Sequence, residues 1–226
     1  LETVPERMEC FDNSHIQGRE TVSSMVVFTD GQPDKKAYRR FRIRAEAGGD
    51  DLIAMREVLT RRFARAKNGD PGFDRLPDLL VIDGGPTQLG VALDVLGELG
   101  LSFVPTIGLA EQHELIYVPG QDAPLELPRA SAALHLLERI RDEAHRFAIT
   151  YHRSLRQKAA LFSVLDGIDG VGEKRKRALF DAFTTLDAIR NASVDSLSAV
   201  PGMTRSSAEA VYRYFHPDTG DDNAPS

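Results

Sequence analysis

The sequence predicts an α/β protein in which a mixed sheet flanked by helices precedes a small all-α domain. Three short strand-like segments open the chain, and strand and helix patterns then alternate. Beyond about residue 158, short helical stretches punctuated by glycine occur as two similar copies. We therefore expect a first domain over residues 1–158, a second over 159–216, and a disordered acidic tail over 217–226.

The first strands are predicted over residues 7–11, 21–29 and 37–43, with glycine-containing turns between them. The stretch "TDGQPD" between the second and third segments is a hairpin signal. Three antiparallel strands are the simplest arrangement of these segments. The first of them is expected to end at Asp12, because "DNS" consists of residues that favour turns.

Helices and further strands follow. Apolar residues recur at helical spacing after Asp50, which is placed to cap a helix. The stretch "LPDLLVIDGGPTQLGVALDVLGEL" predicts a buried strand, a glycine turn and a helix with Pro86 near its start. "FVPTIGLA" and "ELIYVPG" predict two more strands, and a long helical pattern runs from Leu134 to Leu155.

An internal duplication defines the second domain. "IDGVGEKRKRALFDAF" aligns with "VPGMTRSSAEAVYRYF", and each contains an apolar residue, a glycine hairpin and a helix with matching apolar positions. One such unit cannot bury its apolar face alone. We therefore expect the two copies to pack as one module.

The composition indicates a soluble globular protein: 226 residues are 42% hydrophobic and 27% charged. Neither a membrane-spanning stretch nor a secretion signal is expected. The single cysteine, Cys10, excludes internal disulfides and fits a core residue in the reducing cytoplasm. Because the chain begins with Leu1 and not Met, we expect it to be a fragment of a longer protein.

The net charge of −6 argues against a nucleic-acid partner, but the distribution of charge favours one. Residues 35–67 contain eleven Lys/Arg against four Asp/Glu, and residues 139–158 contain six against two. Solvated helix faces would give the same pattern. The basic segments are therefore candidates for DNA contact that need support from a site.

Two acids at the ends of predicted strands are candidate metal ligands. Asp12 follows the first strand, and Asp83 ends the buried strand of "LLVIDGG". Neighbouring strands can bring distant carboxylates together, and Mg²⁺ and Mn²⁺ prefer oxygen ligands. Each acid alone is also explained by a turn or cap role.

His145, in "IRDEAHRFAITYHR" of the long helix, is a candidate for acid–base chemistry. Histidine ordinarily titrates near neutral pH and can orient or deprotonate a water. A histidine beside an apolar helix face is also often a core residue with its hydrogen bonds satisfied.

The glycine hairpins are candidate phosphate sites, because they expose backbone N–H groups at helix N-termini. The second copy lacks the second glycine, so phosphate binding is expected mainly at the first, and two helices that merely pack together remain the alternative. The candidate DNA-binding residues are Gly170, Gly172, Lys174, Arg175 and Lys176 in the first copy and Gly202, Thr204 and Arg205 in the second.

The set of motifs resembles the C-terminal half of the UvrC family, the nuclease subunit of bacterial nucleotide excision repair. The resemblance is carried by "ECFDNSHIQG", "YRRF", "GGDDLIAM", "VIDGGPTQL", "IRDEAHRFAITYHR" and the tandem hairpins, and it covers nearly the whole chain. It implies an RNase H-like endonuclease domain that makes the incision 5′ to a DNA lesion, followed by a tandem helix-hairpin-helix DNA-binding domain.

The resemblance also implies roles for individual residues. The catalytic carboxylates of the family fall on Asp12 and Asp83, its catalytic histidine on His145, and a further important acid on Asp51. Asp51 also fits a first-turn residue that interacts with the helix dipole. Mg²⁺ or Mn²⁺ held by Asp12 and Asp83, damaged double-stranded DNA, UvrB as partner and no membrane association are implied. The alternative function is a non-catalytic DNA-docking module of the repair complex.

Overall fold

The computed structural model describes residues 3–15, 21–43, 50–110 and 114–217. It divides into two compact units, Leu1–Thr150 and Tyr151–Ser226. Residues 218–226 of the predicted disordered tail lie outside the described residues. In the part of the chain that is described, no helix is both long and apolar enough to span a bilayer.

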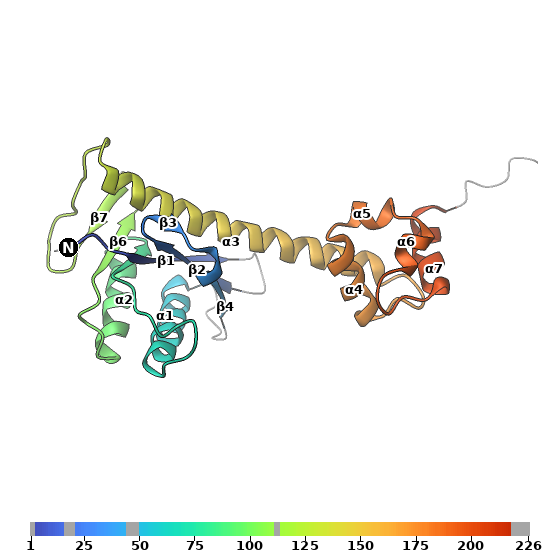
Figure 1. Cartoon of the computed structure of the whole chain (residues 1–226), viewed down its shortest axis with the longest axis horizontal. Coiled ribbons are helices and arrows are strands. Elements are labelled where there is room, and N and C mark those ends of the chain that lie inside the picture. The colour runs from blue at the N-terminus through green and yellow to red at the C-terminus, as the bar shows by residue number, and fades with distance from the viewer. Residues whose placement is uncertain (1–2, 16–20, 44–49, 111–113, 218–226) are drawn as a thin grey trace, which may run out of the picture. The chain divides into compact units, whose positions relative to one another are not determined.

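The first unit is built on a seven-stranded mixed sheet with the order β3-β2-β1-β5-β6-β7, and β4 also pairs with β2 (Figure 1). Strands β1 and β2 are antiparallel, as are β2 and β4, which confirms the predicted antiparallel start. Strands β1, β5 and β6 are parallel neighbours. The strands are β1 Arg7–His15, β2 Thr21–Thr29, β3 Gln32–Pro33, β4 Arg39–Arg42, β5 Leu79–Asp83, β6 Thr106–Ala110 and β7 Leu115–Tyr117.

Strand β1 is longer than the sequence predicts. The expectation that it ends at Asp12 is wrong, because β1 continues to His15, which pairs with Thr21 of β2. The parallel pairing with β5, in contrast, is recorded only up to Phe11 opposite Ile82. Asp12 therefore lies next to the point where β1 parts from β5 while it still pairs with β2.

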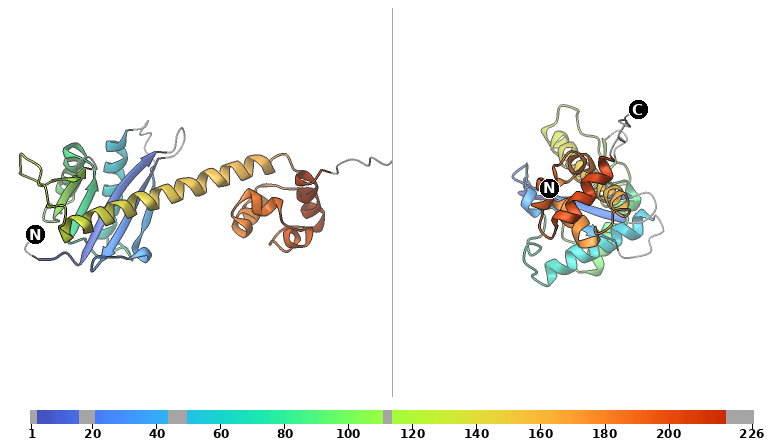
Figure 2. Two further views of the ribbon diagram at one scale, coloured as in Figure 1. Left: turned by 90° about the horizontal axis from the view of Figure 1, so that it is seen from above. Right: turned by 90° about the vertical axis from the view of Figure 1, so that its right-hand side faces the viewer.

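Helices cover both faces of this sheet. Helices α1, Asp51–Lys67, and α2, Pro86–Glu98, lie on one face, and α3, Ala132–Leu165, crosses the strands on the other (Figures 1 and 2). Asp50 caps α1 as predicted, since its carboxylate accepts a hydrogen bond from the Leu52 N–H at 2.8 Å. A short 3₁₀ helix, Lys35–Ala37, precedes β4.

The core of the first unit lies between the sheet and these helices, and it contains Cys10, which is fully buried as predicted. A buried ion pair ties β1 to α1. The Arg62 guanidinium donates to both carboxylate oxygens of Glu9, at 2.7 and 3.0 Å, and neither side chain is exposed. The face of β1 that carries Glu9 is therefore the face covered by α1.

The second unit consists of short helices around its own apolar core, as the duplication predicts. The helices are α4 Glu173–Phe183, α5 Leu186–Arg190, α6 Val194–Ser198 and α7 Arg205–Phe215. Leu179 of α4 and Val211 of α7 occupy matching positions of the two copies, and both are fully buried. Helix α3 is continuous through residues 158 and 159 and contributes Leu161 and Leu165 to this core.

Candidate active site

Asp12 and Asp83 lie next to each other on adjacent strands. The parallel register places Met8 opposite Leu79, and each following pair keeps this offset up to Phe11 opposite Ile82. One further step along the same register sets Asp12 beside Asp83. Their influence on Cys10 supports this placement, because burial raises the pKa of the thiol and the charges of both carboxylates raise it further.

Helix α3 brings His145 to the same place. The His145 Nδ1 atom lies 3.6 Å from Asp12 Oδ2, so the imidazole and the carboxylate are close but beyond hydrogen-bond distance. The imidazole is 64% exposed, whereas the Asp12 side chain is 9% exposed. His145 is therefore not a core histidine, and its ring is accessible to a ligand that also reaches Asp12.

Asp12 is a buried carboxylate with an unsatisfied oxygen. Within the described residues, its Oδ2 atom has no hydrogen-bond partner. Burial raises the pKa of Asp12, the nearby His145 lowers it, and the charge of Asp51 raises it again. Buried polar atoms are normally hydrogen-bonded, so an orphaned carboxylate oxygen is a mark of a site that awaits a ligand.

Asp51 belongs to the first turn of α1, directly after the capping Asp50. Its side chain is exposed, and its charge acts on the pKa of Asp12. The N-terminus of α1 therefore opens at the end of the sheet where Asp12 lies. This position fits both sequence interpretations, a helix-dipole interaction and a supporting acid of the site.

The donor atoms at this point fit a magnesium or manganese ion. Asp12 and Asp83 lie on adjacent strands there, and Asp12 has a buried carboxylate oxygen without a partner among the described residues. Among the described residues, no group of three or more His, Cys, Asp and Glu side chains could hold a metal ion. Mg²⁺ is commonly bound by only one or two carboxylates, together with water and substrate phosphate oxygens. Asp12 and Asp83 are therefore a sufficient protein contribution for such an ion.

Within the basic segment over residues 35–67, several arginines of α1 form ion pairs. Arg56 pairs with Glu98, Arg62 with Glu9, and Arg65 with Asp70. Arg40 of β4 is an exposed residue, and its guanidinium lies 4.0 Å from the ring centre of Phe147 on α3. The excess of positive charge is therefore distributed less evenly in space than along the sequence.

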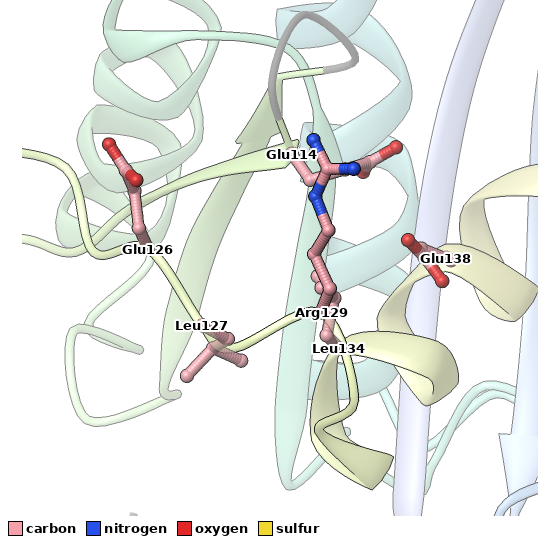
Figure 3. A pocket seen from close by; sticks show the side chains of 6 residues that line it. All are labelled: Glu114, Glu126, Leu127, Arg129, Leu134 and Glu138. Carbon is pink, nitrogen blue, oxygen red and sulfur yellow. The ribbon is translucent and has the colours of Figure 1, made fainter.

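A hollow of about 540 Å³ lies near the start of α3 in the first unit. Three glutamates and one arginine contribute to its lining, which consists of Glu114, Glu126, Leu127, Arg129, Leu134 and Glu138 (Figure 3). Its lining carries an excess of negative charge, and neither Asp12 nor Asp83 belongs to it. This hollow therefore does not suit a DNA phosphate.

The first hairpin of the second unit has the form predicted for a phosphate site. Gly170 has a φ of +80°, a conformation that favours glycine, and Gly172 is the N-cap of α4. Lys174, in the first turn of α4, is exposed. Backbone N–H groups and a lysine therefore coincide at this helix N-terminus.

Two basic residues of the first hairpin have structural partners. The Lys176 ammonium pairs with Asp166 and, at 3.3 Å, with Glu173, and its side chain is only 6% exposed. These bonds raise the pKa of Lys176. The Arg175 guanidinium donates to the carbonyl oxygens of Gly170 and Gly202, the latter at 2.9 Å. Both residues hold the hairpins together, and their contact with DNA stays a prediction.

In the second hairpin, the side chains proposed to contact DNA already have partners within the protein. Gly202 has a φ of +84°. The Thr204 hydroxyl accepts a hydrogen bond from the Ser207 N–H at 3.2 Å and so caps α7. Arg205 pairs with Asp195 and Glu209 at 3.1 and 3.3 Å. Stronger phosphate binding at the first hairpin stays a prediction.

One residue of the site was missed by the sequence reasoning. Ser24 of β2 lies directly opposite Asp12, and its buried hydroxyl also lacks a hydrogen-bond partner among the described residues. The available signal was "TVSSMVVF", where two serines interrupt an otherwise apolar strand. The side chains of Asn13, Ser14 and His15 lie outside the described residues.

Two family descriptions match the chain. Residues 1–149 match the "UvrC RNAse H endonuclease domain", and residues 162–215 match the "SAM-like Helix-hairpin-helix tandem". UvrABC system protein C of Chlorobaculum tepidum is 51% identical over 96% of this chain and 34% of its own length. The Desulforudis audaxviator protein of the same name is 47% identical over 95% of this chain and 37% of its own length. The chain thus spans about a third of these relatives.

Among solved structures, Ciona intestinalis Endonuclease V in complex with inosine-containing DNA aligns with 62% of this chain and 56% of its own. The sequence identity is 18% and the TM-score is 0.35. This similarity is too low to support an argument about the site.

Proposed function

Because the chain belongs to the UvrC family, with its RNase H endonuclease domain and a helix-hairpin-helix tandem, we propose that it cleaves DNA on the 5′ side of a lesion in nucleotide excision repair. The observation that supports the proposal is that His145 lies 3.6 Å from Asp12, whose strand is the neighbour of the strand that ends at Asp83. The bond broken is a phosphodiester P–O bond, with water as the nucleophile.

Asp12 and Asp83 hold a Mg²⁺ or Mn²⁺ ion in this proposal. When bound, such an ion polarises the scissile phosphate and lowers the pKa of an attacking water. The unsatisfied Oδ2 atom of Asp12 supports the assignment, because a cation compensates the burial of its charge. Asp51 supplies further negative charge at the start of α1.

His145 handles a proton of the reaction. Its exposed ring lies 3.6 Å from Asp12, so water or a leaving oxygen at the carboxylates comes within its reach. A nearby carboxylate also orients the ring. General acid–base catalysis of this kind contributes about 10²–10⁴-fold to the rate.

The second unit binds the DNA backbone through its first hairpin. Gly170 and Gly172 present N–H groups at the start of α4, and exposed Lys174 adds positive charge. Damaged double-stranded DNA is the proposed substrate, UvrB the proposed partner in the incision complex, and the cytoplasm the proposed location. The naming of the relatives as parts of the UvrABC system supports this assignment.

The test is incision of a duplex with a single lesion, in the presence of the other UvrABC proteins. We expect Asp12→Ala and Asp83→Ala to abolish 5′ incision and His145→Ala to slow it by about 10²–10⁴-fold. His135→Ala is the matched control, because His135 is an exposed histidine on the same helix. It should cut at the wild-type rate.

Folded variants of Asp12, Asp83 and His145 that all incise at the wild-type rate would contradict the site. A wild-type chain that binds DNA but neither cuts it nor binds Mn²⁺ would favour the non-catalytic docking module instead. Circular dichroism of each variant distinguishes a lost site from a lost fold.

A further inference from the structure

A row of polar residues crosses three strands beneath α3. Ser24 of β2 lies opposite Asp12 of β1 on one side and opposite Arg40 of β4 on the other. Residues directly opposite each other on antiparallel strands point to the same face of a sheet. Asp12 contacts His145, and Arg40 contacts Phe147, so this face is the one covered by α3. Ser24 therefore points to the side of the sheet where the catalytic residues meet.

The Ser24 hydroxyl lacks a hydrogen-bond partner among the described residues, as does Oδ2 of the neighbouring Asp12. Ser24 is completely buried, and in the described parts of the chain its Oγ atom has no hydrogen-bond partner. The Oδ2 atom of Asp12, on the adjacent strand, is the other orphaned oxygen of this row. Buried hydroxyl groups without partners are rare in folded proteins, because they lose their hydrogen bonds to water. Because the Ser24 hydroxyl and the Asp12 carboxylate oxygen lie at facing positions, they are candidates for the same site.

Ser23 provides the contrast. It is also completely buried, but it is the next residue of the strand and so points to the opposite face. Its hydroxyl donates to the backbone carbonyl oxygen of Asp12 at 3.4 Å. Of two neighbouring buried serines, only the one beneath α3 is left without a partner.

We infer that Ser24 is a positioning residue of the metal site. This inference rests on the proposed function, in which Asp12 is a metal ligand. In this inference, metal binding brings the Ser24 hydroxyl, which has no partner in the described structure, into a hydrogen bond with the Asp12 carboxylate. That bond holds the carboxylate in the orientation that binds the ion. Such outer hydrogen bonds orient metal-binding carboxylates, and their loss commonly weakens metal binding by about 10–100-fold.

The test measures Mn²⁺ binding to the full chain without DNA, from the electron paramagnetic resonance signal of free Mn²⁺. We expect Ser24→Ala to raise the Mn²⁺ dissociation constant by about 10-fold or more. Ser23→Ala, the matched control, should stay within about twofold of wild type, because its hydroxyl has no role toward the ion. Asp12→Ala should abolish binding. Urea unfolding of the metal-free proteins is measured in parallel.

The unfolding data separate positioning from packing. Without metal, Ser24→Ala should unfold at or above the wild-type midpoint, because it removes an unsatisfied buried hydroxyl. Ser23→Ala should unfold below it, because it removes a hydrogen bond. Equal losses of Mn²⁺ affinity in both serine variants would overturn the inference in favour of general sheet packing.

The remaining outcomes distinguish failure of the Ser24 role from failure of the proposed metal site. Wild-type Mn²⁺ affinity in Ser24→Ala, with binding lost in Asp12→Ala, would overturn the role of Ser24 and leave the proposed metal site intact. Wild-type affinity in Asp12→Ala would overturn the metal site itself.

Discussion

Two buried carboxylates on strand β1 differ in how fully they are satisfied. Glu9 is completely buried, and its carboxylate accepts hydrogen bonds from Arg7, at 2.8 and 3.1 Å, and from Arg62, at 2.7 and 3.0 Å. Asp12, three residues later on the opposite face, lies 3.6 Å from His145, and its Oδ2 atom has no hydrogen-bond partner among the described residues. Strand β1 thus carries a closed cluster, in which Glu9 is fully hydrogen-bonded by Arg7 and Arg62, and an open cluster, in which Asp12 next to His145 has an oxygen without a partner.

The two carboxylates therefore differ in role: Glu9 contributes to the stability of the fold, and Asp12 is available to a ligand. The Glu9 cluster has no capacity left for a ligand, so its contribution is to fix β1 against α1. The burial of Asp12 raises its pKa, which means that the fold disfavours its ionised form. A ligand cation can then recover the free energy that the protein alone does not.

The largest stability effect is expected on the closed side. Glu9→Gln should lower the free energy of unfolding by about 3–5 kcal/mol, because it leaves the Arg62 guanidinium buried without a counter-charge. Glu98→Gln, which removes an exposed partner of Arg56, should cost less than about 1 kcal/mol. Urea unfolding measures both. Equal costs would show that the Glu9 cluster is not a special structural element.

The second unit contains a similar contrast along α4. Lys176→Met should lower the thermal unfolding midpoint more than Lys174→Met, because Lys176 pairs with Asp166 and Glu173 and is buried. Lys174→Met should instead weaken DNA binding and reduce the slope of log affinity against log salt by about one. Calorimetry and binding titrations at several salt concentrations check this. If Lys176→Met reduced the slope of log affinity against log salt more than Lys174→Met does, Lys176 and not Lys174 would be the residue that contacts DNA phosphates.

The smallest effect on stability is expected at Asp12 of the open cluster, where a substitution should stabilise the protein. Because the folded state raises the pKa of Asp12, it binds the proton more tightly than the unfolded chain, and wild-type stability falls as pH rises above the ordinary value of 3.8. Asp12→Asn avoids this loss, so the metal-free variant should melt higher at neutral pH, by about 2–4 °C per kcal/mol.

The advantage of Asp12→Asn should disappear below pH 3.8, where Asp12 is protonated in both states. Melting curves in EDTA from pH 3 to 8 test this dependence. A variant less stable than wild type at pH 7 would show that the ionised carboxylate has partners that stabilise it.

Periodicity in the sequence was sufficient for most elements, and the strands that carry Asp12 and Asp83 are neighbours in the sheet. The end of β1 was mispredicted because local turn preference was weighed without the partner strand. The long β2 strand pairs with Asn13, Ser14 and His15, and ladder hydrogen bonds override the preference of these residues for turns.

Buried charges were harder to recognise. Arg62 and Lys176 belong to basic stretches that look exposed when charge alone is counted. Their positions contained a signal, however. Arg62 lies seven residues after the buried Met55 on the same helix face, and Lys176 aligns with the buried Ala208 of the second hairpin copy. What the sequence does not contain is the partner, since the Glu9 that neutralises Arg62 is 53 residues away.

Arg175 has a consequence for how the duplicated module can evolve. Its guanidinium, from the first copy, bonds the loop carbonyls of both copies, and the equivalent position in the second copy is the buried Ser207. The first copy therefore supplies a link between the two loops that the second copy does not supply. A chimera built from two second copies would lack the arginine that joins the loops. The two copies are therefore not interchangeable, although their sequences align as a repeat.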